Sequence, residues 1–101
     1  MTAHAVFITH HTKAGQRADA EQVWNQMMKP AIQANPNHLA YVYTLPADEP
    51  DVIRAFQLYS SAEHAVAFLR TPEYLAYSEA VGPHLAGPPQ VASAPAAWVK
   101  E

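Results

Sequence analysis

The stretch that decides the fold is residues 38–63, which read HLAYVYTLPADEPDVIRAFQLYSSAE. Its two β-branched and aromatic runs are His38–Leu45 and Asp51–Ser60, and the polar segment between them is bounded by prolines, as is typical of a turn. Two such runs joined by a short turn predict a β-hairpin. Ser60 stands three residues before Glu63, which is the spacing of a capping box. A helix is therefore expected to begin directly after the second strand.

The residues before this hairpin predict a strand and a long helix. Ala3–Thr12 alternates between two faces and is expected to form the first strand. Gln16–Ala34 carries apolar residues at the three-to-four spacing of an amphipathic helix. Pro30 lies inside this segment, and proline removes a helical hydrogen bond. We therefore expect the helix to kink or split near Lys29.

The residues after the hairpin predict two helices and a last strand. The capped helix is expected to run to about Arg70, and Thr71-Pro72 then caps a second short helix. Gly82-Pro83 ends that helix. Gln90–Val99 is the last expected strand, and Pro95 inside it favours an edge position or a bulge because proline cannot donate to a sheet hydrogen bond.

The predicted element order is β-α-β-β-α-α-β, an α+β arrangement. Two β-α-β units of this kind form a ferredoxin-like domain, with helices packed on one face of one antiparallel sheet. The expected strands carry large residues on both faces, as Val6 and Phe7 do side by side. A sheet with one solvated face should alternate more cleanly. We therefore expect a second copy of the chain to cover the other face in an isologous homodimer.

Length, charge and composition restrict the classes of partner. The 101 residues fit one domain over 1–101. The net charge of −3 is scattered and forms no basic patch, which argues against nucleic acid as a partner. The absence of cysteine removes disulfides, thiolate nucleophiles and Cys-based metal sites. No signal peptide is visible and no apolar stretch approaches about 18 residues, so we expect a cytoplasmic protein without a membrane span.

The six histidines do not predict a metal site. His10 and His11 are neighbours on a strand, point to opposite faces and cannot chelate one ion together. His4 shares a face with His10 but lies about 20 Å away along an extended strand. The histidines without a partner at ligand spacing are His38, His64 and His84. The three glycines are widely separated and form no phosphate-binding loop, so no nucleotide cofactor is expected either.

Aromatic side chains come from every expected element. Tyrosine and tryptophan join an apolar ring to a polar group, which suits a pocket for a flat aromatic ligand, although the same residues could simply fill the core and a dimer interface. Gln57 is the most unusual polar residue because it stands mid-strand on the face of Tyr59, and a buried glutamine needs hydrogen-bond partners. It is either part of the structural framework or a ligand contact. The candidate pocket residues are Trp24, Tyr41, Tyr43, Gln57, Phe68, Tyr74 and Trp98.

Three segments together resemble the antibiotic biosynthesis monooxygenase family, which includes quinol monooxygenases. They are Lys13-Ala14-Gly15 followed by a long helix and Asn35–Tyr41, the strand-to-helix junction Phe56–Glu63, and the helix end Ala67–Tyr74. The resemblance implies a dimeric α+β barrel that oxidises a small aromatic quinol or phenol with O₂ and uses no metal, flavin or haem. Such an enzyme needs a pocket, a proton acceptor and polar groups that hold an anion.

The chain departs from this family at positions that handle protons. Many members carry Glu where this chain has Gln57, and His where it has Phe68 and Glu73. Because glutamine and phenylalanine take up no proton near neutral pH, other groups must act if the chain is an enzyme. The candidate catalytic residues are then His10, Tyr59 and His84. The alternatives are a non-catalytic dimeric barrel that binds a small hydrophobic ligand, and a purely structural domain with a filled core.

Overall fold

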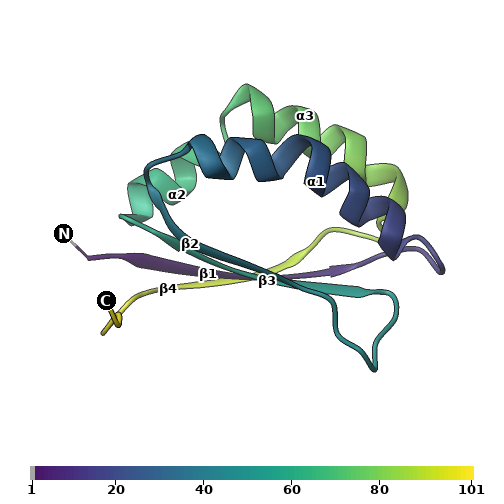
Figure 1. The fold of residues 1–101 in the computed structure, drawn as a ribbon, viewed down its shortest axis with the longest axis horizontal. Helices are drawn as coiled ribbons and strands as arrows, with labels where there is room; N and C mark the ends of the chain where they lie inside the picture. Colours follow the sequence, from purple (N-terminus) through teal and green to yellow (C-terminus); the bar gives the residue numbers. More distant parts are fainter. Residues whose placement is uncertain (1) are drawn as a thin grey trace.

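The computed structural model describes residues 2–101, in which a four-stranded antiparallel sheet is covered on one face by three α-helices (Figure 1). This arrangement confirms the α+β, ferredoxin-like order β-α-β-β-α-α-β that the sequence predicts. The elements are β1 His4–His11, α1 Arg17–Ala34, β2 His38–Thr44, β3 Val52–Tyr59, α2 Ala62–Phe68, α3 Pro72–Val81, a short 3₁₀ turn η1 at Gly82–His84, and β4 Gln90–Pro95.

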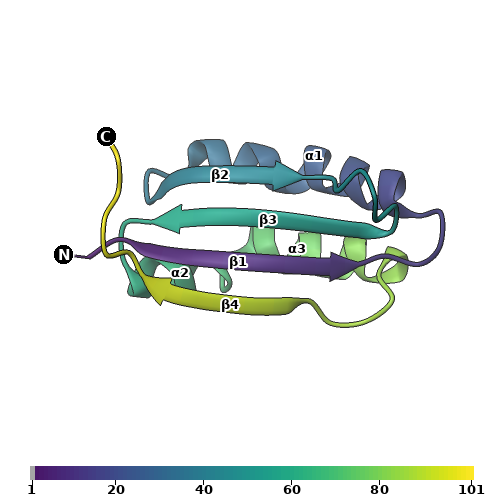
Figure 2. The same cartoon turned by 90° about the horizontal axis from the view of Figure 1, so that it is seen from below.

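The strands lie in the order β2-β3-β1-β4, and all neighbouring pairs are antiparallel (Figure 2). The predicted hairpin of β2 and β3 is confirmed. Val6 of β1 pairs with Gln57 of β3 on one side and with Ser93 of β4 on the other. These three residues therefore share the face that the helices cover. β4 is an edge strand, as Pro95 predicts, but the expected extension to Val99 is wrong because regular pairing stops at Pro95.

The start of α2 differs from the sequence prediction by one residue. Ser61, not Ser60, is the N-cap, and its hydroxyl accepts a hydrogen bond from the backbone N–H of His64 at 3.2 Å. Ser60 instead donates to the side-chain oxygen of Asn37 at 2.9 Å. The predicted capping box at Ser60 is therefore wrong because a loop residue takes its hydroxyl. Thr71 does cap α3 as expected, accepting from Tyr74 N–H at 3.2 Å.

Helix α1 runs without a break from Arg17 to Ala34, although Pro30 lies inside it. Of the two expected outcomes, a kink or a split near Lys29, the split is therefore wrong. Met28, which is 3% exposed, and Ile32 both pack into the core, one on each side of the proline. Packing of an apolar face contributes most of the stability of a helix in a folded protein, and here it outweighs one lost hydrogen bond.

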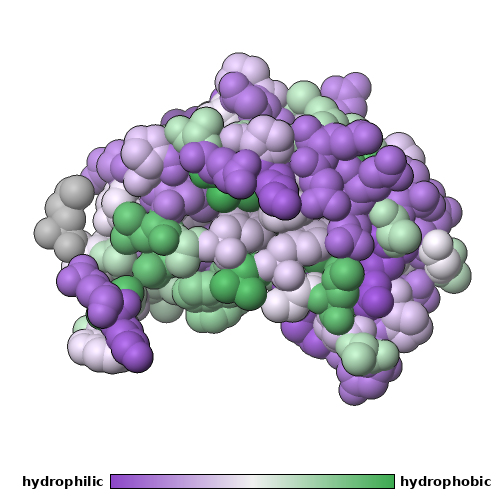
Figure 3. All heavy atoms as spheres, viewed as in Figure 1, coloured by the Kyte–Doolittle hydropathy of each residue, from purple (hydrophilic) through white to green (hydrophobic). Residues whose placement is uncertain are grey.

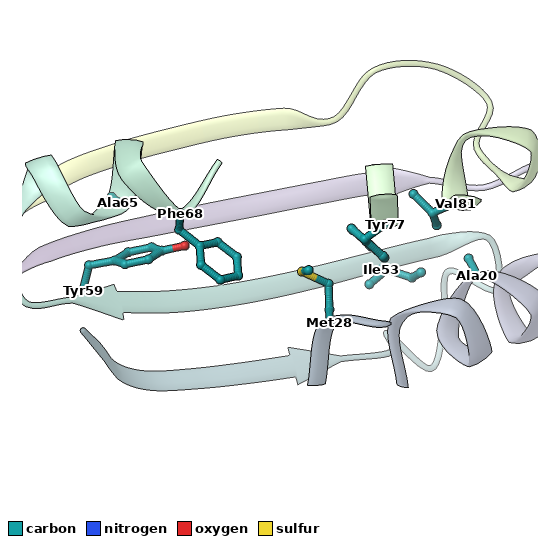
Figure 4. Packing of buried hydrophobic residues seen from close by; sticks show 8 residues of the cluster. All are labelled: Ala20, Met28, Ile53, Tyr59, Ala65, Phe68, Tyr77 and Val81. Atoms are coloured by element: carbon teal, nitrogen blue, oxygen red, sulfur yellow. The ribbon is translucent and has the colours of Figure 1, made fainter. Parts of the chain in front are cut away.

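The core lies between the helices and the covered face of the sheet (Figure 4). Ile53 of β3 is 2% exposed and lies below Met28 and Tyr77, which come from α1 and α3. Tyr59 and Phe68 form the other end of the same buried cluster. Figure 4 shows these two groups at different positions along β3.

The other face of the sheet has no helix over it, and large apolar residues remain exposed there. Phe7 and Val42 are each 51% exposed, and the Phe7 ring lies 5.4 Å from that of Phe56, measured between centroids. Figure 3 shows apolar residues at the level of the sheet, whereas the outer surface of the helices is mainly polar. The sheet therefore carries large apolar residues on its helix-free face as well as on the face that the helices cover.

The position of Ile53 at the centre of the core gives a stability prediction. We expect Ile53→Ala to lower the free energy of unfolding by about 2–5 kcal/mol, because it leaves a cavity between β3 and two helices. Leu75→Ala is the control, since Leu75 is 57% exposed and its loss should change stability by no more than about 0.5 kcal/mol. Urea unfolding followed by circular dichroism measures both, and equal losses would contradict this account of the core.

Candidate functional site

A cavity of about 240 Å³ lies between the covered face of the sheet and the helices. All four strands and all three helices contribute to its walls. Every residue of β4 is exposed, and Val91, which is 58% exposed, belongs to the wall. The cavity is therefore open toward β4, where no helix covers the sheet. Its wall residues with polar groups are His4, His10, Tyr41, Gln57, Tyr59, Tyr74, Tyr77 and Ser93.

Gln57 is the centre of the polar groups in this cavity. It is only 5% exposed, and its Oε1 accepts a hydrogen bond from the Tyr59 hydroxyl at 2.5 Å. The same oxygen lies 3.3 Å from Nε2 of His38. Gln57 is thus both a structural partner and a wall residue, which joins the two readings that the sequence leaves open.

His10 has a different environment at the other part of the wall. Its Nδ1 is buried and has no hydrogen-bond partner among residues 2–101. Burial lowers the pKa of His10, because a charged imidazole loses its hydration there. The ring is therefore neutral at pH 7 and belongs to the cavity wall, while its Nδ1 is enclosed without a partner among residues 2–101.

The tyrosines of the wall keep their protons. Burial raises the pKa of Tyr41 to about 12, and the Trp24 indole N–H donates to its hydroxyl at 3.3 Å. Burial also raises the pKa of Tyr59 above its usual range, and its hydroxyl already donates to Gln57. The predicted candidate Tyr59 thus stands in the cavity as a protonated donor and not as a proton acceptor.

The structure brings some of the predicted site residues into the cavity wall. Those that line it are His10, Tyr41, Gln57, Tyr59, Phe68 and Tyr74. Trp24 and Tyr43 lie behind the wall and stack on each other with centroids 4.1 Å apart. They support Tyr41 from behind, through the Trp24 hydrogen bond.

Two predicted site residues lie away from the cavity. The η1 turn directs His84 toward the start of α1, where its Nδ1 lies 3.0 Å from the side-chain oxygen of Gln16. Trp98 lies in the segment after β4 and is 79% exposed. Neither ring is near enough to line the wall.

His38 is not among the predicted site residues, but it contacts two residues of the cavity wall, Gln57 and Tyr59. Simple alternation would place it on the face opposite Tyr41, but β2 has a register irregularity between His38 and Ala40. Leu39 is 55% exposed at that irregularity, and the His38 ring lies 4.3 Å from that of Tyr59 between centroids. Nothing in the sequence marks such a bulge, so this approach could not be foreseen.

Within the described residues 2–101, no three His, Asp or Glu side chains gather as a metal site would require. In the same part of the chain, no helix combines the length and the apolar character needed to cross a bilayer.

Comparison with known families identifies the domain. The family model of antibiotic biosynthesis monooxygenases matches residues 3–80. The chain belongs to this family. The match includes β1 through α3, and so contains every wall residue of the cavity except those of the β4 region.

Solved structures of several proteins show the same fold. A Caulobacter crescentus CB15 protein that carries the family name superposes with a TM-score of 0.88 at 24% identity, covering 96% of this chain and 92% of its own. Rv0793 from Mycobacterium tuberculosis gives 0.81 at 23% identity, covering 99% and 98%. A conserved Methanosarcina mazei Go1 protein gives 0.83 at only 8% identity, covering 93% and 92%. No curated protein matches the chain.

The lowered pKa values of the two buried histidines predict a pH-dependent stability. Burial lowers the pKa of His10 and of His38 in the folded chain. The unfolded chain binds protons near pH 6.5 whereas the folded chain resists them, so stability should be lost as pH falls below about 6.5. Urea unfolding between pH 7.5 and 5 measures this loss.

Replacing one histidine separates its share of the effect. His10→Phe should make the free energy of unfolding depend less steeply on pH, because phenylalanine has no imidazole that the unfolded chain protonates more easily than the folded chain does. His11→Phe is the matched control, since His11 is its exposed neighbour on the opposite face, and it should keep the wild-type slope. Identical slopes for the two variants would contradict the assignment to His10.

Proposed function

We propose that the chain is a cofactor-independent monooxygenase that oxidises a small aromatic quinol or phenol with O₂. The observation that carries the proposal is that His10, whose Nδ1 has no hydrogen-bond partner among residues 2–101, stands in the wall of an aromatic-lined cavity. Family membership supports the reaction class.

The chemistry requires a proton acceptor first. A phenol gives up electrons far more readily after it loses its proton, and the neutral imidazole of His10 can accept that proton. The aromatic anion then reduces O₂, one oxygen atom bonds to a ring carbon, and the other leaves as water. A quinol and O₂ thus give a hydroxyquinone and water, and the substrate supplies all the electrons.

The wall of the cavity suits such a substrate. The rings of Phe68 and Tyr74, whose centroids are 6.0 Å apart, offer apolar surface to a flat molecule. The open side at β4 gives a path for entry, and the helices exclude water from the opposite side. These features favour an aromatic ligand over a charged or strongly polar one.

Oxygen consumption tests the proposal directly. Metal-free protein should consume O₂ with at least one member of a panel of hydroquinones, naphthoquinols and anthrone-like phenols, above the uncatalysed rate. His10→Phe should lower kcat by about 10²- to 10⁴-fold because it removes the proton acceptor. His11→Phe should leave kcat unchanged. Uptake that is absent, or equal in both variants, would overturn the proposal.

A second function is ligand binding without turnover. It is favoured by Gln57 and Phe68, which stand where many family members carry Glu and His, and by the fully protonated wall tyrosines. A hydrophobic molecule that stays bound through purification, together with no O₂ uptake across the panel, would select this function.

We also propose that two copies of the chain pack through the helix-free face of the sheet. Phe7, Val42 and Phe56 lie on that face, and the first two are half exposed. Burying such a contiguous apolar surface against its own copy is the usual solution for a small homodimer.

Light scattering coupled to size-exclusion chromatography measures the assembly. The wild-type chain should have twice the mass of one chain at micromolar concentration, and Phe7→Lys should shift it to the monomer, because it places a charge in the apolar face. Leu75→Lys, at an exposed position on α3, is the matched control and should leave the mass unchanged. A wild-type mass equal to that of one chain would contradict the proposed dimer.

A further inference from the structure

A chain of hydrogen bonds runs from the turn before β2 into the cavity. The backbone N–H of Asn37 donates to Oδ1 of Asn35 at 3.1 Å. Nδ2 of Asn35 lies 2.9 Å from Nδ1 of His38, and Nε2 of His38 lies 3.3 Å from Oε1 of Gln57. Tyr59 completes the chain from the other side, donating to the same oxygen of Gln57 at 2.5 Å.

The direction of every bond in this chain follows from its first member. A backbone N–H can only donate, so the end of the Asn35 amide that faces Asn37 must be its oxygen. The other end is then the NH₂ group, which donates to Nδ1 of His38. A neutral imidazole that accepts at Nδ1 carries its proton on Nε2, and that N–H donates to Gln57.

His38 is held neutral in this arrangement. Burial lowers its pKa, and the hydrogen bond to Gln57 raises it by less. Its ring is packed edge-on against Phe68 at 4.6 Å between centroids, which fixes the ring plane. Because the ring plane is fixed, the orientation of the Asn35 amide determines which ring nitrogen carries the proton and therefore which end of the Gln57 amide faces His38.

These hydrogen bonds fix the orientation of the Gln57 side-chain amide. Its Oε1 accepts from both His38 and Tyr59, which uses both lone pairs. Its Nε2 makes no hydrogen bond to residues 2–101, although Gln57 is 95% buried at 5% exposure and lines the cavity. Its two N–H donors are therefore available to a ligand in the cavity, because Nε2 is not among the buried side-chain atoms and has no protein partner among residues 2–101.

We propose that Gln57 binds an oxygen acceptor of the ligand through Nε2, and that His38 and Asn35 are positioning residues that fix this amide. The ligand class is an aromatic molecule with a carbonyl or ring-bound oxygen anion. The inference rests on the proposed function only in taking this cavity as the ligand site.

The acceptor site and His10 lie at different ends of the cavity. Gln57 pairs with Val6, and His10 pairs with Ile53, four positions farther along both strands. Four residues of extended strand span about 13 Å. A ligand long enough to reach both side chains would present its acceptor oxygen to Gln57 and its acidic group to His10.

Two probes of the same shape test the acceptor without any oxygen chemistry. They are 2-acetylnaphthalene, which has a carbonyl oxygen, and 2-isopropenylnaphthalene, which has a CH₂ group in its place. Equilibrium dialysis should show that the wild-type chain binds the ketone roughly 3- to 10-fold more tightly, which is the worth of one hydrogen bond. Because neither probe is a quinol, this ratio is independent of O₂ uptake. Loss of uptake with the ratio retained would reject the enzyme and keep the acceptor site.

Three variants locate the effect. Gln57→Glu keeps the oxygen that accepts from His38 and Tyr59 but removes the donors, so the preference should vanish or reverse. His38→Phe keeps the ring contact with Phe68 and should reduce the preference while the affinity for 2-isopropenylnaphthalene stays unchanged, whereas a merely structural role would weaken both. His64→Gln is the control outside the hydrogen-bond chain and should keep the wild-type ratio.

The tautomer of His38 can be measured without any ligand. Nitrogen-15 NMR of the wild-type chain should show His38 as the neutral tautomer with its proton on Nε2. A proton on Nδ1 would overturn the positioning role. Equal affinity of the wild-type chain for the two probes, binding of neither, or an unchanged ratio in Gln57→Glu would overturn the acceptor site.

Discussion

The constraint on which the structure depends is that three helices cover one face of a four-stranded sheet only in part. Helix α1 packs beside α3 above the strands, and α2 lies over the end of β3, while β4 remains uncovered. The side chains beneath the helices close the core at Ile53. Toward β4 there is nothing to fill the space, and a cavity remains there. Because all three helices pack on one face of the sheet, large apolar residues on the opposite face stay exposed.

Much of this fold could be predicted from the sequence because its signals are local. The hairpin, the Thr71 cap of α3 and the edge position of β4 each depend on a few neighbouring residues. The errors arise where tertiary contacts override local preference. Ser60 has the spacing of a helix cap, but Asn37 occupies its hydroxyl. Pro30 should interrupt α1, but packing on both sides holds the helix together.

The candidate site was predictable in its residue types and less so in its geometry. Aromatic residues from several elements do meet around one cavity, and Gln57 is buried among them as its mid-strand position suggests. Alternation correctly puts His10 and the exposed His11 on opposite faces, but no pattern shows that Nδ1 of His10 lacks a partner among residues 2–101. His38 reaches Gln57 only through an irregularity in β2, which a period of two cannot reveal. The hydrogen bond between His38 and Gln57 is therefore visible only in the folded structure.

The replacement of a carboxyl group by the amide of Gln57 changes how the site can use charge. A glutamate beside His38 would favour the charged imidazole and could form an ion pair with it. An amide carries no charge, so burial dominates and His38 stays neutral. The two ends of the cavity then differ in character. The Gln57 end is rich in oriented hydrogen bonds, and the His10 end has a neutral imidazole. In the proposed oxygenase, these two ends would divide the work, with Gln57 holding the oxygen of the aromatic anion and His10 accepting the proton.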